Sequence, residues 1–264
     1  MKYAVYRFSV CCMRYTVCGM KDHEQTANGF LLVNKPSGMT SHDVVAVARR
    51  MLGIKKIGHA GTLDPMATGL LILGVGKATK KLGNIIGLPK TYTAEIALGA
   101  TSTTDDAEGT LDTFTTPTKV GVQNVDSRIR GNGVLLEIPS NTKIESCLKK
   151  FIGEQQQTPP QFSAIKINGQ RAYKKARQGE TVDLKPRTIT IYDIKLVSYR
   201  YPLITIETSV SSGTYIRSLA RDIGQALGTG AYLSKLERTS IGEFKLADAI
   251  NLKEISEKSL FQIM

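Results

Sequence analysis

The chain contains no tryptophan, only three histidines and four cysteines, and no unbroken apolar run of the roughly 18 residues that a membrane-spanning helix needs. Cys11, Cys12 and Cys18 lie close to the N-terminus and Cys147 lies far from them, which is neither a disulfide framework nor a CxxC zinc pair. The histidines are not at the spacings of metal ligands. We therefore expect no metal ion, no membrane contact and a reducing compartment, the cytoplasm.

The N-terminal residues lack the pattern of a folded segment. Arg7 and Arg14 interrupt the apolar residues around them, so the segment does not have the apolar centre of a secretory signal. Met20 is followed by the polar stretch "KDHEQTANG", and residues 1–19 read as a translated upstream extension. We expect residues 1–27 to be an N-terminal extension that is either disordered or the result of a start assigned to Met1 instead of Met20.

The net charge is strongly positive. The chain has 35 Lys and Arg against 23 Asp and Glu, which gives +12. Such a field attracts polyanions, of which nucleic acid is the most common inside a cell. The alternative is that the basic surface serves only solubility.

The apolar pattern changes irregularly between the periods of strands and helices. Strand patterns occupy residues 29–35, 70–76, 90–100, 187–199, 203–210 and 231–244. Helix patterns occupy residues 41–52 and 142–153, a short basic stretch that is stopped by Gly179, and the later part of residues 211–228, which begin as a glycine-containing loop. Because strict strand–helix alternation is absent, we predict an α+β fold with a mixed, mostly antiparallel central sheet flanked by helices and loops.

Several local signals refine this prediction. Thr40 and Asp43 have the spacing of a capping box, and Val44, Val47, Ala48 and Met51 fall on one face of the helix that follows. Residues 155–162, "QQQTPPQF", read as a linker because the double proline excludes a helix. Residues 111–141 have a weak pattern and read as a loop-rich insertion with no assigned role. We expect one catalytic domain over residues 28–252, followed by a short tail over 253–264.

The glycine-rich stretches do not indicate a nucleotide site. Gly69 and Gly74 have the spacing of a P-loop, but Val75 stands where that motif requires lysine. The segment "GVGKAT" is only half of a dinucleotide fingerprint. We therefore expect no organic cofactor.

One loop combines small residues with a single carboxylate. In "GHAGTLDPMATG", residues 58–69, Asp64 lies among Gly, Ala and Thr, is followed by Pro65, and precedes a buried strand. An Asp–Pro pair in such a loop is compatible with simple turn chemistry. A functional Asp64 would need a partner such as Arg217 to stay ionised, although Arg217 alone could form a surface ion pair. Tyr92 beside Lys90 suits stacking on an unpaired base, or is a core residue.

Five motifs in the same order give a more specific indication. They are "NGFLLVNKPSGMTSHDVV", "KKIGHAGTLDPMATGLLILGVGKATK", "KTYTAEIALGATSTTDDAEG", "PPQFSAIKINGQRAYKKARQG" and "SGTYIRSLARDIGQALGTGAYLSKLERTSIGEF". Together they closely resemble the TruB family of tRNA pseudouridine synthases, over about residues 28–250. The resemblance implies the pseudouridine synthase fold, and isomerisation of uridine 55 in the T arm of tRNA without metal or organic cofactor.

The resemblance also implies the site residues. Asp64 matches the catalytic aspartate, and the substrate-binding positions match His59, Tyr92, Tyr215, Arg217 and Leu236. We expect Lys55, Lys80, Arg171 and Lys175 to contact RNA phosphates. Whether Asp64 acts as a nucleophile or as a base is left open, and Tyr215 is the candidate for removal of the C5 proton.

The chain departs from the family at its end, where we expect no full C-terminal PUA domain. The expected partner is the T stem-loop of tRNA, bound by a monomer. A competing hypothesis from another class is a tRNA-binding folding helper with little or no catalytic activity. The isomerisation requires an extruded nucleotide and a site that retains the detached base. The candidate residues suit both requirements, which favours the enzyme.

Overall fold

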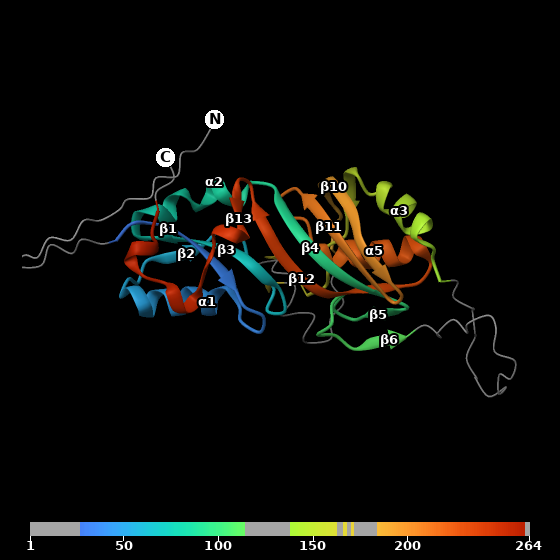
Figure 1. Ribbon diagram of the computed structural model, residues 1–264, viewed down its shortest axis with the longest axis horizontal. Helices are drawn as coiled ribbons and strands as arrows, with labels where there is room; N and C mark the ends of the chain where they lie inside the picture. The colour runs from blue at the N-terminus through green and yellow to red at the C-terminus, as the bar shows by residue number, and fades with distance from the viewer. Residues whose placement is uncertain (1–26, 114–137, 163–165, 168–169, 172–183, 262–264) are drawn as a thin grey trace, which may run out of the picture. The chain divides into compact units, whose positions relative to one another are not determined.

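The computed structural model describes residues 27–113, 138–162, 166–167, 170–171 and 184–261 (Figure 1). The chain divides into two compact units. Unit 1 comprises the residues up to Leu88 and those from Arg238 onward, and unit 2 comprises Pro89–Glu237. The expected N-terminal extension lies outside the described residues except for Ala27.

Unit 1 is built on the antiparallel pair of β1 (Gly29–Lys35) and β3 (Thr68–Val75). Strand β2 (Ile57–His59) pairs antiparallel with β3, and β14 (Ile250–Asn251) pairs parallel with β1. Almost every residue of β1 and β3 is buried. A strand buried on both faces carries a continuous apolar run, which explains the sequence "LLILGV".

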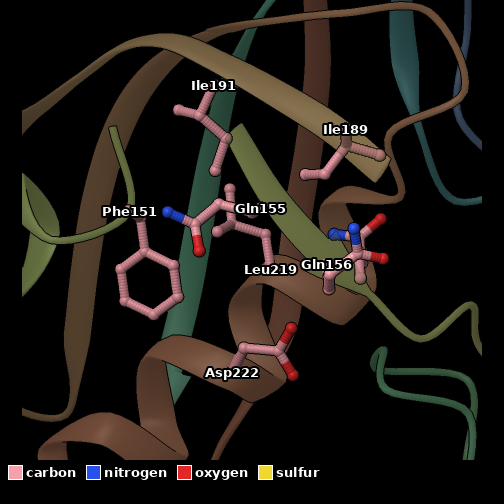
Figure 2. A pocket seen from close by; sticks show the side chains of 8 residues that line it. Phe151, Gln155, Gln156, Ile189, Ile191, Leu219 and Asp222 are labelled. Carbon is pink, nitrogen blue, oxygen red and sulfur yellow. The ribbon is translucent and has the colours of Figure 1, made fainter. Parts of the chain in front are cut away.

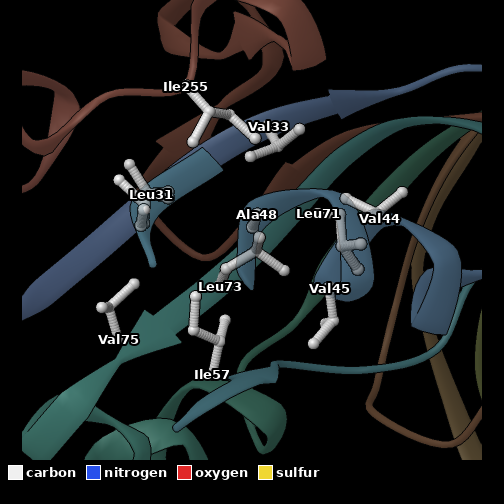
Figure 3. Packing of buried hydrophobic residues seen from close by; sticks show 11 residues of the cluster. Leu31, Val33, Val44, Val45, Ala48, Ile57, Leu71, Leu73, Val75 and Ile255 are labelled. Carbon is white, nitrogen blue, oxygen red and sulfur yellow. The ribbon is translucent and has the colours of Figure 1, made fainter. Parts of the chain in front are cut away.

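Helix α1 (Ser41–Leu52) begins and ends as its sequence predicts. Thr40 and Asp43 form the capping box, and Gly53 ends the helix in the left-handed conformation with φ 67°. The predicted apolar face is partly wrong, because Met51 is exposed and Val45 and Leu52 are buried instead. Figure 3 shows Val44, Val45 and Ala48 of α1 packed against Leu71 and Leu73 of β3.

Short elements complete unit 1. They are the 3₁₀ turns η1 (Gly76–Lys81), η2 (Leu246–Asp248), η3 (Leu252–Glu254) and η4 (Glu257–Ser259), helix α2 (Leu82–Ile86) and strand β13 (Phe244–Lys245). Ile255 and Val33 pack in the same core as α1 (Figure 3), so residues from both ends of the described chain close this unit.

Unit 2 contains a sheet in the order β12–β4–β11–β10–β7. The strands are β4 (Lys90–Leu98), β7 (Gly153–Gln157), β10 (Arg187–Arg200), β11 (Leu203–Val210) and β12 (Ala231–Ile241), the last of which extends into unit 1 from Arg238. The pairings of β4 with β11, β11 with β10 and β10 with β7 are antiparallel. Alternate burial of Tyr92, Ala94 and Ile96 confirms the pattern predicted for β4.

Helices α3 (Asn141–Lys149) and α5 (Ile216–Leu227) lie next to each other in unit 2 (Figure 1). Two small hairpins pair β5 (Ala100–Ser102) with β6 (Leu111–Thr113) and β8 (Lys166–Ile167) with β9 (Gln170–Arg171). Of the insertion expected over 111–141, residues 114–137 lie outside the described part.

Two expectations around residues 142–157 are wrong. The helix ends at Lys149 instead of residue 153, and the supposed linker begins inside strand β7, because Gln155 and Gln156 pair with β10 at Ile189 and Thr188. Glutamine has no strong strand signal of its own, so only the partner strand decides this conformation. Among the described residues, no helix has the length and apolar character required to cross a membrane.

Candidate active site

Asp64 lies in the loop between β2 and β3, and the residues on both sides of it are held by hydrogen bonds. The Ser41 hydroxyl bonds both backbone groups of Leu63, with Leu63 N at 2.9 Å and Leu63 O at 3.2 Å. The Pro65 carbonyl accepts from Gly38 N at 2.9 Å. Asp64 itself begins a turn, since its carbonyl accepts from Ala67 N at 3.1 Å. The position of the Asp64 backbone is therefore fixed by neighbours on α1 and on the turn before it.

A buried lysine also binds the backbone of this loop. The Lys35 side chain is fully buried, and its ammonium group donates to the carbonyls of Pro36, Met39 and Pro65 at 2.9, 2.6 and 3.1 Å. A buried cation needs such partners to offset the loss of hydration. Lys35 thereby joins the end of β1 to the residue that follows Asp64.

A buried arginine holds the two ends of the loop. Arg238 is 1% exposed, and its Nε and Nη2 donate to Leu70 O at 2.8 Å and Gly61 O at 3.1 Å. Gly69 has φ 98°, and a Cβ atom there would overlap the Arg238 backbone. Glycine is required at this point because both the conformation and the close approach exclude a side chain.

His59 is the last residue of β2 and lies beside His42 of α1. The two rings meet edge to face with centroids 5.3 Å apart, and His59 Nδ1 is buried with no hydrogen-bond partner among the described residues. Burial is the main cause that lowers the pKa of His59, and the charges of His42 and Arg238 lower that pKa further. His59 is therefore kept neutral at physiological pH.

In unit 2, Arg217 lies in the first turn of α5 and is almost completely buried. Its Nη1 lies 3.3 Å from the Asp106 carboxylate, and the exposed fractions of the two side chains are 7% and 3%. The same guanidinium donates to Thr104 O and Phe162 O, each at 3.3 Å. Asp106 also accepts hydrogen bonds from Thr104 and from Glu108 N. The turn "TTDDAEG" thus serves to bind the arginine.

The remaining predicted substrate-binding residues of unit 2 lie on adjacent elements. Tyr92 of β4 and Leu236 of β12 are each 7% exposed and lie on neighbouring strands. Tyr215 occupies the N-cap position of α5 with an extended backbone. The predicted pairing of Arg217 with Asp64 joins residues of different units and stays a prediction.

The predicted phosphate contacts fall in two regions. Lys55 and Lys80 are exposed on unit 1, before β2 and within η1. Arg171 lies on β9, and Lys175 lies outside the described residues. Within the described ranges, no three His, Cys, Asp or Glu side chains are grouped to hold a metal ion.

Three residues important to this geometry were not identified from the sequence. Lys35 and Arg238 are cations whose burial is not visible in the sequence, because charged side chains are usually exposed. Asp106 lies in a turn that reads simply as acidic. The doubled aspartate after several threonines was the available signal, but its partner lies 111 residues further along, at Arg217.

The chain matches known family models over most of its length. A model described as TruB family pseudouridylate synthase (N terminal domain) matches residues 49–133 and 121–216. A second, described as tRNA pseudouridylate synthase B C-terminal domain, matches residues 217–262.

Individual relatives agree with the family models. The tRNA pseudouridine synthase B of Corynebacterium diphtheriae is 45% identical over 234 residues, which cover 87% of this chain and 73% of that protein. The protein of the same name from Mycobacterium tuberculosis H37Rv is 43% identical over 237 residues, which cover 88% and 73%.

A solved structure shares the fold. The chain aligns with one described as a Cbf5–Nop10–Gar1 complex at TM-score 0.64 and 30% identity, over 89% of this chain and 60% of that one. The chain thus spans less than two thirds of that neighbour. The predicted fold class, α+β with a mostly antiparallel sheet, is confirmed. Taken with the motifs and the family models, these likenesses show that this chain belongs to the TruB family of pseudouridylate synthases.

Proposed function

We propose that this chain isomerises uridine to pseudouridine in tRNA, at position 55 of the T arm. The relatives that share 42–45% of their residues with it bear the name tRNA pseudouridine synthase B. The net charge of +12 suits a polyanionic substrate.

The observation that carries the proposal is the fixed loop around Asp64. Hydrogen bonds from Ser41, Gly38 and Lys35 hold Leu63 and Pro65. The backbone of Asp64, which carries the carboxylate between them, therefore has a fixed position. Enzymes gain rate by holding a reacting group in its productive geometry. A lone carboxylate also fits this reaction, because a second one, as in glycoside hydrolysis, would activate water.

The reaction balances without any added reagent. The bond from C1′ to N1 breaks, the uracil rotates, C1′ bonds to C5, and the C5 proton is removed while N1 gains a proton. Asp64 either attacks C1′ as a nucleophile or acts as a base that abstracts a proton. Tyr92 and Leu236 hold the detached uracil between an aromatic and an apolar side chain, and Tyr215 assists removal of the C5 proton.

The other predicted residues prepare the substrate. Arg217 contributes to substrate binding as a guanidinium whose position is fixed by the Asp106 carboxylate. His59 remains neutral and supports the RNA loop around the extruded nucleotide. Lys55, Lys80, Arg171 and Lys175 bind phosphates, which gives affinity but little sequence information.

The decisive experiment compares Asp64→Asn with the native chain on an unmodified tRNA transcript. Pseudouridine is mapped at base resolution by chemical modification, because the isomerisation leaves the mass unchanged. We expect complete conversion of uridine 55 by the native chain and none by Asp64→Asn. The matched control is Asp248→Asn, an exposed carboxylate of the same unit, which should retain full activity. A native chain that leaves uridine 55 unchanged contradicts the proposal.

The folding helper that acts only by binding is not favoured by the relatives reported above, which are named as synthases. It would be supported if Asp64→Asn and the native chain refolded tRNA equally and neither formed pseudouridine. We further propose that the enzyme acts as a monomer in the cytoplasm. The free, buried Cys147 suits a reducing compartment, and light scattering measures the oligomeric state.

A further inference from the structure

Gln157 is the last residue of strand β7 and is almost completely buried, with 4% of its surface exposed. A buried amide without hydrogen bonds costs about 1–3 kcal/mol. The sequence around it, "QQQTPP", reads as a linker, and nothing in the proposed chemistry uses it. The question is therefore what the Gln157 side chain binds.

Both polar atoms of the Gln157 amide bind the backbone of one residue, Tyr215. The amide nitrogen donates to Tyr215 O at 3.0 Å, and Tyr215 N donates to the amide oxygen at 2.8 Å, across 58 residues of sequence. A primary amide presents its donor and acceptor as a peptide group does. Gln157 therefore pairs with Tyr215 as a neighbouring strand residue would, and two bonds fix orientation where one would allow rotation.

Tyr215 is a residue whose backbone needs such support. It lies at the N-cap of α5 with φ −97° and ψ 112°, and Gly213 two residues earlier has φ 88°. The Tyr215 carbonyl also accepts from Leu219 N at 3.1 Å, which begins the helix. Gln157 thus fixes the peptide groups between a glycine turn and the helix, and these groups hold the Cα atom from which the tyrosine side chain projects.

The segment after Gln157 holds the rest of the first turns of α5. Thr158 O accepts from Ser218 Oγ at 2.9 Å and from Arg221 Nη2 at 3.1 Å, and Phe162 O accepts from Arg217. Figure 2 shows Leu219 and Asp222 of α5 facing the same pocket as Gln155 and Gln156 of β7. These contacts hold the helix without involving Gln157. The distinct contribution of Gln157 is therefore to the backbone of Tyr215.

We propose that Gln157 is a positioning residue for the isomerisation, which acts by fixing the Tyr215 backbone and through it the tyrosine ring. This inference rests on the proposed function and on the role of Tyr215 in it. It assigns a task to a residue that the proposed chemistry does not use.

The test uses the full chain with Gln157→Met, which keeps the length of the side chain and removes both hydrogen bonds. The matched control is Gln156→Met on the same strand, whose exposed amide binds only the Thr188 hydroxyl at 2.8 Å among its described contacts. Single-turnover rates are measured with saturating enzyme, and tRNA affinity is measured separately. We expect the rate to fall about 10- to 100-fold in Gln157→Met, because small misplacements of a reacting group have effects of this size. The tRNA affinity should stay within about 2-fold, since binding and positioning are separate terms.

A second readout follows the ring itself. With 3-fluorotyrosine at position 215, the native chain should give one sharp ¹⁹F resonance, and Gln157→Met should give a broadened or doubled one. Gln156→Met should leave the resonance unchanged. This measurement also separates the two proposals: a native chain without synthase activity overturns the proposed function, while the ¹⁹F spectra still decide whether Gln157 orders the ring.

The inference is overturned if folded Gln157→Met keeps the native rate and the native ¹⁹F line shape, or if rate and tRNA affinity fall together. Gln157→Asn, one methylene shorter, is the second variant and should show the same loss of rate. If both variants fail to fold, Gln157 is a requirement for folding and the positioning role is wrong.

Discussion

The loop around Asp64 in unit 1 and the start of α5 in unit 2 both contain buried cations that bind backbone carbonyls, and the cations of α5 also pair with carboxylates. Lys35 and Arg238 donate to backbone carbonyls of Pro36, Met39, Pro65, Gly61 and Leu70. Besides its carbonyl partners, Arg217 lies against the Asp106 carboxylate, and Arg221 lies 2.9 Å from the carboxylates of both Asp105 and Asp222.

The two regions differ because one is an irregular stretch of backbone and the other is the start of a regular helix. The Asp64 loop is irregular backbone, and cations bound to carbonyls fix the path of such a chain. The first turns of α5 are already regular, and the carboxylates there fix guanidinium groups. One region is therefore sensitive to changes in backbone hydrogen bonding, and the other to changes in charge and pH.

The largest expected effect on stability follows from removal of the buried carboxylate of unit 2. Asp106→Asn leaves Arg217 beside a neutral amide, and breaking a buried ion pair costs about 3–5 kcal/mol. We expect the free energy of unfolding in urea to fall by about 3 kcal/mol. Glu108→Gln, an exposed acid of the same turn, is the control and should change it by less than about 0.5 kcal/mol. An equal effect of both changes would show that the buried pair contributes nothing specific.

The next effect concerns Arg238 of unit 1, whose side chain binds two backbone carbonyls. Arg238→Met removes the donors to Gly61 O and Leu70 O, and buried carbonyls without partners cost about 1–3 kcal/mol each. We expect a loss of about 2–4 kcal/mol by urea denaturation. Lys235→Met, whose side chain is 76% exposed on the same strand, should be nearly neutral. A stable Arg238→Met chain with native synthase activity would contradict the role of Arg238 in holding the Asp64 loop.

A smaller, pH-dependent effect is expected at Arg221. Burial raises the pKa values of Asp105 and Asp222, while Arg221 lowers both. In Arg221→Met these pKa values rise further, so the folded state binds more protons than the unfolded state above the ordinary carboxyl pKa of about 3.8. Stability then falls as pH rises through this window. The deficit should be about 1 kcal/mol at pH 7, because Arg221 is part-exposed, and should shrink towards pH 4. Urea titrations at the two pH values measure it, and a deficit independent of pH would exclude the ion pairs as its cause.

The smallest effect concerns His59. Its pKa is lowered on folding, so the unfolded state binds a proton first and the contribution of His59 to stability is lost as pH falls below about 6.5. In ¹H NMR titrations, His42→Asn should raise the pKa of His59 only partly, because burial is the larger cause. His59→Gln assigns the resonance. An ordinary pKa in His42→Asn would show that the neighbouring ring, and not burial, is the main cause.

The local elements were determined by the sequence. The capping box at Thr40, the stop at Gly53 and the alternation in β4 all follow from short-range chemistry, and the structure confirms them. The five motifs were also sufficient to predict the family, which the models and relatives confirm. The errors lie at Met51, at the end of α3 and in "QQQTPP".

The tertiary structure alone decided which polar side chains are buried and what they bind. Lys35, Arg238 and Gln157 belong to residue types that are usually exposed, and nothing adjacent in sequence marks them as buried. Each of them has a partner far along the chain, 30, 168 and 58 residues away at Pro65, Leu70 and Tyr215. A hydrogen bond depends on distance and direction in space, which sequence periodicity does not contain. The sequence therefore determined the catalytic candidate, Asp64, and only the fold decided how its loop is held.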